Sequence, residues 1–214
     1  MKQLFLCLSF IIISFAMRAQ KMDTIPSRVN LGLNLATLVS GTPELQGEYY
    51  FNKYVGAFAA TGYTFRPVRG WIKVKDDVNL ESQHGAYWKI GFKARLFRPD
   101  KRIPLPWIQL LYIGSQYDER GTQDSYNYTT GAYSVINRHE SGIVHGGAVA
   151  VGADFRAGRH FIIRVGFQSG YYKRNDHMGS SLLTYQPGFG AEGFLLPEQA
   201  MLCVMYRLGN VDRK

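Results

Sequence analysis

Charged side chains at alternate positions are the first residues in this 214-residue chain whose types and spacing could do chemistry. Lys89, Lys93 and Arg95 alternate with apolar residues in the stretch GAYWKIGFKARLF, and Glu44 and Glu48 share one face of an earlier segment. The full set comprises Glu44, Glu48, Lys89, Lys93, Arg95, Asp154, Arg164 and Arg207. Acids and bases on one enclosed face form ion pairs or line a narrow path for ions. The set therefore predicts a polar interior of one of these two kinds.

A second set contains the residue types of a Ser/His/acid hydrolase. Glu140 and Ser141 are adjacent, and His145 follows Ser141 by four residues, which puts both side chains on one face of a strand. The histidines are His84, His139, His145, His160 and His177, and none has HExxH or another metal-ligand spacing. We therefore predict no catalytic residue, no metal site and no cofactor, with hydrolysis kept as an alternative.

Three glycines, Gly188, Gly190 and Gly193, match the GxGxxG spacing of a dinucleotide-binding turn. That fingerprint needs a strand before it and a helix after it. Here Leu195, Leu196 and Pro197 follow instead. We interpret the match as coincidental and the segment as a flexible loop.

Residues 85–97 carry the clearest signal for the elements that must position these side chains. Trp88, Ile90 and Phe92 fall on one face and Lys89 and Lys93 on the other, a period of two that predicts a strand. Soluble strands usually have about five or six residues, whereas a strand that crosses a bilayer needs roughly 9 to 11. The pattern predicts a transmembrane β-strand. Residues predicted to face lipid here and on other strands are Leu31, Leu33, Trp88, Ile90, Phe92, Ile163, Val165, Leu202 and Val204.

The same alternation predicts eight strands, at 29–38, 44–51, 54–65, 85–97, 104–117, 142–155, 160–172 and 199–208. Long polar loops are predicted at 66–83, 118–141 and 173–198, and most other connections are short. Short turns at one end and long loops at the other are typical of outer-membrane barrels. The predicted fold class is all-β, an eight-stranded antiparallel up-and-down transmembrane β-barrel. Because such a barrel only just accommodates side chains, an ion-paired lumen is favoured over an ion path.

The N-terminus of the chain predicts export. Lys2, the apolar run 4–15 and Ala19 before Gln20 are typical of a secretory signal peptide at 1–19. Residues 20–28 then form a periplasmic lead-in, 29–208 the barrel and 209–214 a C-terminal tail. The formal net charge is +9, but export makes nucleic acid an improbable partner, and anionic headgroups or polysaccharide fit better. Cys203 is the single cysteine after the signal, so no internal disulfide is expected.

Four segments of the chain resemble those of a known protein family. They are the signal ending in Ala-Gln, the EYYFNKYVG hairpin, the GAYWKIGFKARLF strand and the GADFRAGRHFIIRVGFQSGYY hairpin. Over roughly 29–208 the chain resembles the small eight-stranded outer-membrane β-barrel proteins of Gram-negative bacteria, similar in architecture to the outer-membrane protein A barrel. The resemblance implies a location in the outer membrane. Members usually end on an aromatic residue read by the assembly machinery, whereas this chain continues past Tyr206 with LGNVDRK.

The expected function is a non-enzymatic, porin-like barrel of the cell envelope with a lumen filled by side chains. Its expected role is structural or surface-binding through the long loops. The expected partners are outer-membrane lipid and lipopolysaccharide, the barrel-assembly machinery, and a surface polysaccharide or cell-surface ligand. One alternative is an exported soluble lipocalin-like barrel, with apolar residues inside and charged residues outside. Another is an outer-membrane enzyme that modifies lipid A, because some eight-stranded barrels have this activity.

Overall fold

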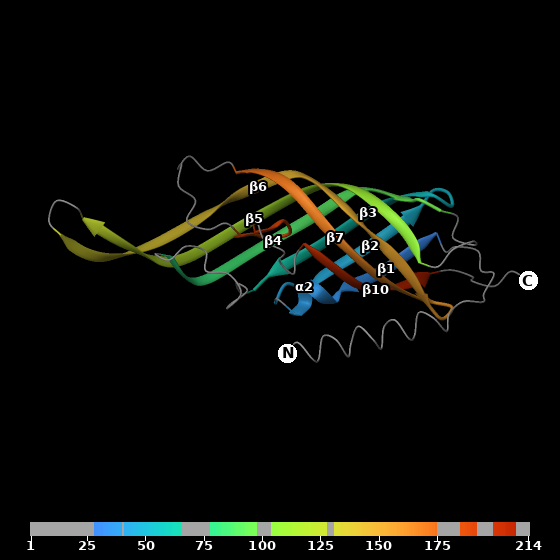
Figure 1. The fold of residues 1–214 in the computed structure, drawn as a ribbon, viewed down its shortest axis with the longest axis horizontal. Helices are drawn as coiled ribbons and strands as arrows, with labels where there is room; N and C mark the ends of the chain where they lie inside the picture. Colours follow the sequence, from blue (N-terminus) through green and yellow to red (C-terminus); the bar gives the residue numbers. More distant parts are fainter. Residues whose placement is uncertain are drawn as a thin grey trace, which may run out of the picture.

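The computed structural model describes residues 28–39, 41–65, 78–97, 104–127, 131–174, 185–191 and 199–208. The predicted signal peptide 1–19, the lead-in up to residue 27 and the tail 209–214 lie outside the described residues. Within them, eight antiparallel strands close into one barrel, and a long hairpin extends from one end of it (Figure 1). The prediction of an all-β, eight-stranded, antiparallel barrel is confirmed.

The barrel strands follow one another around the wall in chain order. They are β1 (Val29–Asn34), β2 (Glu44–Tyr50), β3 (Val55–Thr64), β4 (Val78–Arg95), β5 (Leu105–Asn127), β6 (Ala132–Ala157), β7 (Phe161–Arg174) and β10 (Ala200–Leu208). A short helix, α2 (Leu35–Val39), follows β1, and a small separate ladder joins β8 (Tyr185–Gln186) to β9 (Gly190–Ala191). β1 pairs with β10 and closes the ring, so the barrel wall has no edge strand.

The first strand is shorter than predicted, because the alternating pattern 29–38 spans both β1 and α2. Asn34 explains the change: its Oδ1 accepts a hydrogen bond from the backbone N–H of Ala36 at 3.2 Å, as an N-cap residue does. Thr37 donates from its Oγ1 to the Asn34 carbonyl oxygen at 3.1 Å. These local hydrogen bonds bend the chain into a helical turn while Leu33 and Leu35 still read as alternate apolar residues.

Residues 118–141 were predicted to be a polar loop, and this prediction is wrong. β5 and β6 pair continuously from Leu105↔Asp154 to Asn127↔Ala132, which makes the segment two extended strands. In the same way, β4 begins at Val78 inside the predicted loop 66–83 and pairs with β5 as far as Gln123. Residues 66–77 lie outside the described part. The hairpin formed by 118–127 and 132–143, called the outer hairpin below, projects beyond the barrel in Figure 1.

Burial alternates along the wall, so each strand has an inner and an outer face. On β2 the buried residues are Glu44, Gln46, Glu48 and Tyr50, and Leu45 and Tyr49 between them are exposed. Apolar side chains fill much of the bore, including Phe58, Trp107, Leu111, Ile113, Met201, Cys203 and Met205. None of the helices among the described residues is long and apolar enough to cross a membrane.

Trp107 explains why the inner residues of the neighbouring strands are small. A Cβ atom on Gly152 would lie 2.5 Å from its indole ring, and one on Gly166 would lie 2.8 Å from it. β5, β6 and β7 are adjacent, so the ring lies across two glycines of the inner wall. The bore is therefore wide enough for one large ring only where its neighbours have no side chain.

Candidate functional site

The centre of the lumen holds a four-residue ion cluster whose members come from four strands. Arg164 on β7 places Nη1 2.7 Å from Oε1 of Glu48 on β2 and Nε 2.8 Å from Oδ1 of Asp154 on β6. Lys93 on β4 places Nζ 2.9 Å from Oδ2 of Asp154 and 3.2 Å from Oε1 of Glu48. All four side chains are at most 2% exposed. Two acids and two bases thus neutralise one another across the bore.

A second ion pair lies nearer the end that carries α2. Lys89 Nζ is 2.7 Å from Oε2 of Glu44, and both are buried. The Glu44 carboxylate also accepts hydrogen bonds from Tyr87 Oη at 2.9 Å, Gln46 Nε2 at 2.6 Å and Asn34 Nδ2 at 3.2 Å. Each of these donors is itself an inward-facing residue, so the pair is anchored to strands β1, β2 and β4.

These contacts make the lumen a filled interior. A buried ion pair is costly to form but far more costly to break, because removal of one partner leaves a charge in a low-dielectric space. The cluster therefore favours one arrangement of the four strands that supply it. Lys93 Nζ also lies 4.6 Å from the centroid of the Trp107 ring, and this cation–π contact ties the cluster to the apolar filling.

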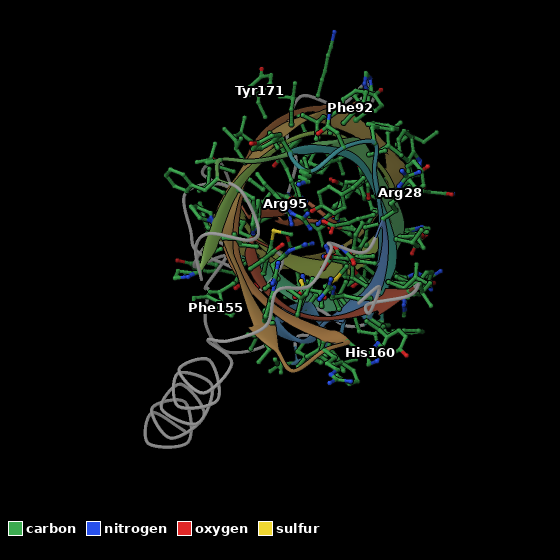
Figure 2. The ribbon with its side chains drawn as sticks, turned by 90° about the vertical axis from the view of Figure 1, so that its right-hand side faces the viewer. Arg28, Phe92, Arg95, Phe155, His160 and Tyr171 are labelled. Carbon is green, nitrogen blue, oxygen red and sulfur yellow. The ribbon has the colours of Figure 1, made fainter. Side chains whose placement is uncertain are left out.

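The two remaining charged residues of the predicted set lie apart from this cluster, at the end with the short turns. The Arg95 guanidinium lies over the Tyr50 ring, with its Cζ 3.5 Å from the ring centroid. Arg207 donates from Nη1 to the Arg159 carbonyl oxygen at 3.1 Å. Figure 2, viewed from this end, shows Arg95 inside the barrel and Phe92, Phe155 and Tyr171 outside it. All eight predicted lumen residues are thus buried on the inner face.

Sequence reasoning did not assign Arg156 to the lumen. Arg156 was assigned to the turn after the sixth strand, yet β6 continues to Ala157 and Arg156 is buried. The signal was present, because Asp154 and Arg156 are two positions apart and continue the same inward series.

The opposite end of the lumen is closed by part of the predicted loop 173–198. Residues 187–189 are buried, and Gln168 on β7 donates from Nε2 to the Gly188 carbonyl oxygen at 2.9 Å. The Phe189 ring lies 5.2 Å from the Tyr172 ring, centroid to centroid. Gly188 has φ 79°, which suits glycine at the turn between β8 and β9. The GxGxxG segment is therefore partly a packed turn, contrary to the flexible loop expected; Gly193 lies outside the described residues.

The end of the lumen near the outer hairpin also holds polar residues that the sequence analysis did not single out. Gln83 on β4 donates from Nε2 to Oε1 of Glu119 on β5, and both side chains are buried. Thr42 donates from Oγ1 to Oγ1 of Thr64 at 3.3 Å. Gln83 and Glu119 lay in segments predicted to be loops, so no inward face was assigned to them.

The hydrolase set does not assemble in the described structure. Ser141 and His145 both face outward, but four residues of strand separate them by about 13 Å. His145 Nδ1 instead lies 3.2 Å from Tyr112 Oη on β5. The described residues contain no group of three or more His, Cys, Asp or Glu side chains arranged to hold a metal ion. His177 lies outside the described residues.

The outer face of the wall is apolar and exposed. Among the nine residues predicted for it, Phe92 is 62% exposed, and Leu31, Leu33, Trp88, Ile90, Val165 and Val204 are exposed as well. Ile163 and Leu202 are half-buried on the same face. Toward the outer hairpin this face becomes polar: on β5, the outward residues change from Leu110 and Tyr112 to Gln116 and Asp118. The apolar surface is thus a belt that ends where the outward-facing residues become polar.

No protein-family model matches the chain, and a search of curated proteins finds no match either. The functional conclusion therefore depends on the geometry of the belt, the lumen and the outer hairpin.

Proposed function

We propose that this chain is a non-enzymatic outer-membrane β-barrel protein with a lumen closed by side chains. The single observation that supports the proposal is the direction in which the side chains of the wall point. A closed ring of eight strands exposes an apolar belt on its outside and buries ion pairs inside. In water, exposure of Phe92, Ile90, Leu110 and their neighbours over a continuous surface would be costly. In a bilayer that belt lies against hydrocarbon, and a closed barrel satisfies its backbone hydrogen bonds internally.

The two ends of the barrel suggest its orientation. Residues 51–54 and 158–160 join strands by short turns at one end, which suits the periplasmic side. The outer hairpin, α2 and the β8–β9 ladder are at the other end, which suits the cell surface. The alternative of a soluble lipocalin-like barrel needs the reverse facing, with apolar side chains lining the cavity.

A surface-binding role fits the outer hairpin. It carries exposed apolar side chains near its tip, with Tyr133 82% and Val135 66% exposed. Exposed aromatic and aliphatic side chains at the end of an extended hairpin are suited to contact a polysaccharide or a protein on another surface. Lipopolysaccharide beside the belt and the barrel-assembly machinery are the other partners of this proposal.

The test combines fractionation with gel mobility. The wild-type protein should be found in purified outer membranes and should migrate differently before and after boiling, because a closed barrel resists detergent until it is heated. Ile90→Arg should strongly reduce the membrane-assembled form, since an arginine near the bilayer midplane of a barrel costs about 2–4 kcal/mol. Gln116→Arg is the matched control: it adds the same side chain at an outward, exposed position beyond the belt.

Recovery of the wild-type protein from the soluble fraction, with equal mobility boiled and unboiled, would contradict the proposal. Assembly of the Ile90 variant at the level of the Gln116 control would contradict it as well, because both arginines would then face water.

A further inference from the structure

Two rows of outward-facing residues cross four neighbouring strands where the apolar belt ends near the outer hairpin. The cross-strand partners of the first row are Trp88 on β4, Gly114 on β5, His145 on β6 and Lys173 on β7. In the second row, nearer the middle of the belt, the partners are Ile90, Tyr112, Gly147 and Tyr171. Directly opposite residues of paired strands share a face, with Cβ atoms about 4.5–5.5 Å apart. We call these eight residues the outer-rim patch.

Aromatic contacts fix one side of the outer-rim patch. The Trp88 ring covers Gly114, since a Cβ atom there would lie 2.6 Å from it, and its centroid is 5.5 Å from that of the Tyr112 ring. Tyr112 Oη in turn lies 3.2 Å from His145 Nδ1. When Tyr112 donates this hydrogen bond, the neutral imidazole carries its proton on Nε2. The Nε2–H group is then a donor that a ligand can use.

Lys173 carries a positive charge beside this donor. It is exposed, and its ammonium has no ion-pair or hydrogen-bond partner among the described residues. The nearest outward acid on β5, Asp118, is four positions beyond Gly114, about 13 Å along the strand, and it is paired with His139. A lysine at the edge of an apolar belt holds its ammonium at the level of the lipid headgroups. An anion at that level would therefore meet an uncompensated charge.

Gly147 leaves a gap in the second row of the patch. It is exposed, and a Cβ atom built on it would have no atom nearer than 3.8 Å, so the space outside its backbone is open. Tyr112 is its partner on one side, and Tyr171, which is 83% exposed and lies outside the ring of strands in Figure 2, is its partner on the other. Val149 continues this outward face into the belt. An acyl chain along the gap would contact apolar atoms of its neighbours.

We propose that the outer-rim patch binds a phosphorylated lipid of the outer leaflet, with a phosphate monoester on Lys173 and His145 and an acyl chain over Gly147. An ammonium and an imidazole N–H are both donors to a phosphate dianion. The two donors are adjacent where the belt ends, and the gap leads from them toward the hydrocarbon, which suits a phosphate that carries a chain. This inference rests on the proposed outer-membrane function and adds to it the lipid group and the residues that bind it.

The test uses the full chain folded in a non-ionic detergent, after its heat-dependent gel mobility has been confirmed. Diphosphoryl lipid A is titrated into the complexes of protein and detergent, and native mass spectrometry counts the lipid molecules retained by each chain. Saturable retention of one lipid A molecule is expected for the wild type. The same lipid without its phosphates should bind at least about tenfold more weakly, because the charge-assisted hydrogen bonds are lost.

Three variants locate the site on the barrel. Lys173→Gln should weaken retention of diphosphoryl lipid A about tenfold and leave that of the phosphate-free lipid unchanged. Lys53→Gln is the matched control, because it removes the same charge from an exposed position in the turn between β2 and β3, and it should change neither. Gly147→Leu fills the gap and should weaken retention of both lipids, since the acyl chain then loses its place.

Failure of this inference can be told apart from failure of the proposed function. A heat-modifiable protein of the outer membrane that retains both lipids equally would overturn the phosphate site alone. Equal effects of the Lys173 and Lys53 variants would overturn its location. Competition by inorganic phosphate at the concentration of lipid A itself would overturn the role of the acyl chain. If Gly147→Leu does not give the heat-modifiable form, the two lysine variants, both at exposed positions, still decide the result.

Discussion

β5 and β6 run through the barrel wall and continue beyond it as the outer hairpin, yet the two regions of these strands differ in their sequence pattern. In the wall, residues of β6 such as Val149 and Val151 are exposed and Ala148 and Ala150 are buried. In the outer hairpin, residues 131–137 are all exposed. The hydrogen-bonded ladder is continuous through both. The comparison teaches that alternation in a sequence reports a difference between two environments and does not report the extended backbone itself.

The largest effect that would distinguish the two regions is expected from the ion cluster. Arg164→Met leaves Glu48 and Asp154 with Lys93 as their one remaining partner in the cluster, and should destabilise the folded barrel by about 3–5 kcal/mol. Reversible urea unfolding in micelles or vesicles measures the change. Arg120→Met in the outer hairpin removes the same type of side chain, 63% exposed, and should change the free energy of unfolding by less than about 1 kcal/mol. Similar losses for both variants would contradict the assigned difference.

A pair of substitutions on the outward face of β6 sharpens the comparison further. Val151→Arg places a charge in the apolar belt and should cost about 2–4 kcal/mol in vesicles. Val135→Arg, sixteen positions earlier on the same face, should cost close to nothing, because Val135 already lies in the outer hairpin. Unfolding of both variants in lipid vesicles, at matched lipid composition, checks the prediction. An equal cost would show that the belt extends to the tip.

A smaller effect is expected at the junction between β1 and α2. Asn34→Ala removes the side chain that caps α2 and that also donates to Glu44, and should cost about 0.5–2 kcal/mol. Asn34→Ser keeps a capping oxygen and should recover part of the loss. Thermal unfolding followed by gel mobility measures both variants. A serine variant no more stable than the alanine variant would assign the effect to the contacts of Asn34 with Glu44 and with the Leu202 N–H, and not to the cap.

The smallest effect is expected in the outer hairpin. Asp118 Oδ2 lies 2.8 Å from His139 Nε2, and both side chains are about half exposed. Because water and salt screen exposed pairs, Asp118→Asn should change the free energy of unfolding by less than about 1 kcal/mol. Urea unfolding at low and high salt checks this value. A loss that approached the loss from Arg164→Met would remove the contrast between the two regions.

Most of the barrel wall could be predicted from the sequence because each of its strands borders two unlike environments. The residues 85–97 show this: Trp88 and Phe92 are exposed on one face and Lys89 and Lys93 are buried on the other. The end of β1 could not be predicted in the same way, because the side chain of one residue, Asn34, overrides a pattern that continues beyond it. Arg156 was missed because Gly158 made the whole segment 156–159 resemble a turn.

The outer hairpin and the packed turn at 187–189 were beyond this kind of reasoning. Both faces of the hairpin are exposed at residues 131–137, so these residues are not selected for alternation, and the polar composition of 118–141 is typical of a loop. Phe189 was read as part of a loop, and its burial depends on Tyr172 and Gln168 of β7, which are far away in sequence. No local pattern encodes such a contact.

The sequence by itself determined the number of barrel strands and which side chains share a face, because the period of two follows from the geometry of an extended chain. Tertiary structure alone decided which charges meet. Closure of the ring brings Glu48, Lys93, Asp154 and Arg164 within ion-pair distance from four strands. The reason is that partners across a bore are fixed by the register and order of the strands around it, and these are properties of the closed barrel as a whole.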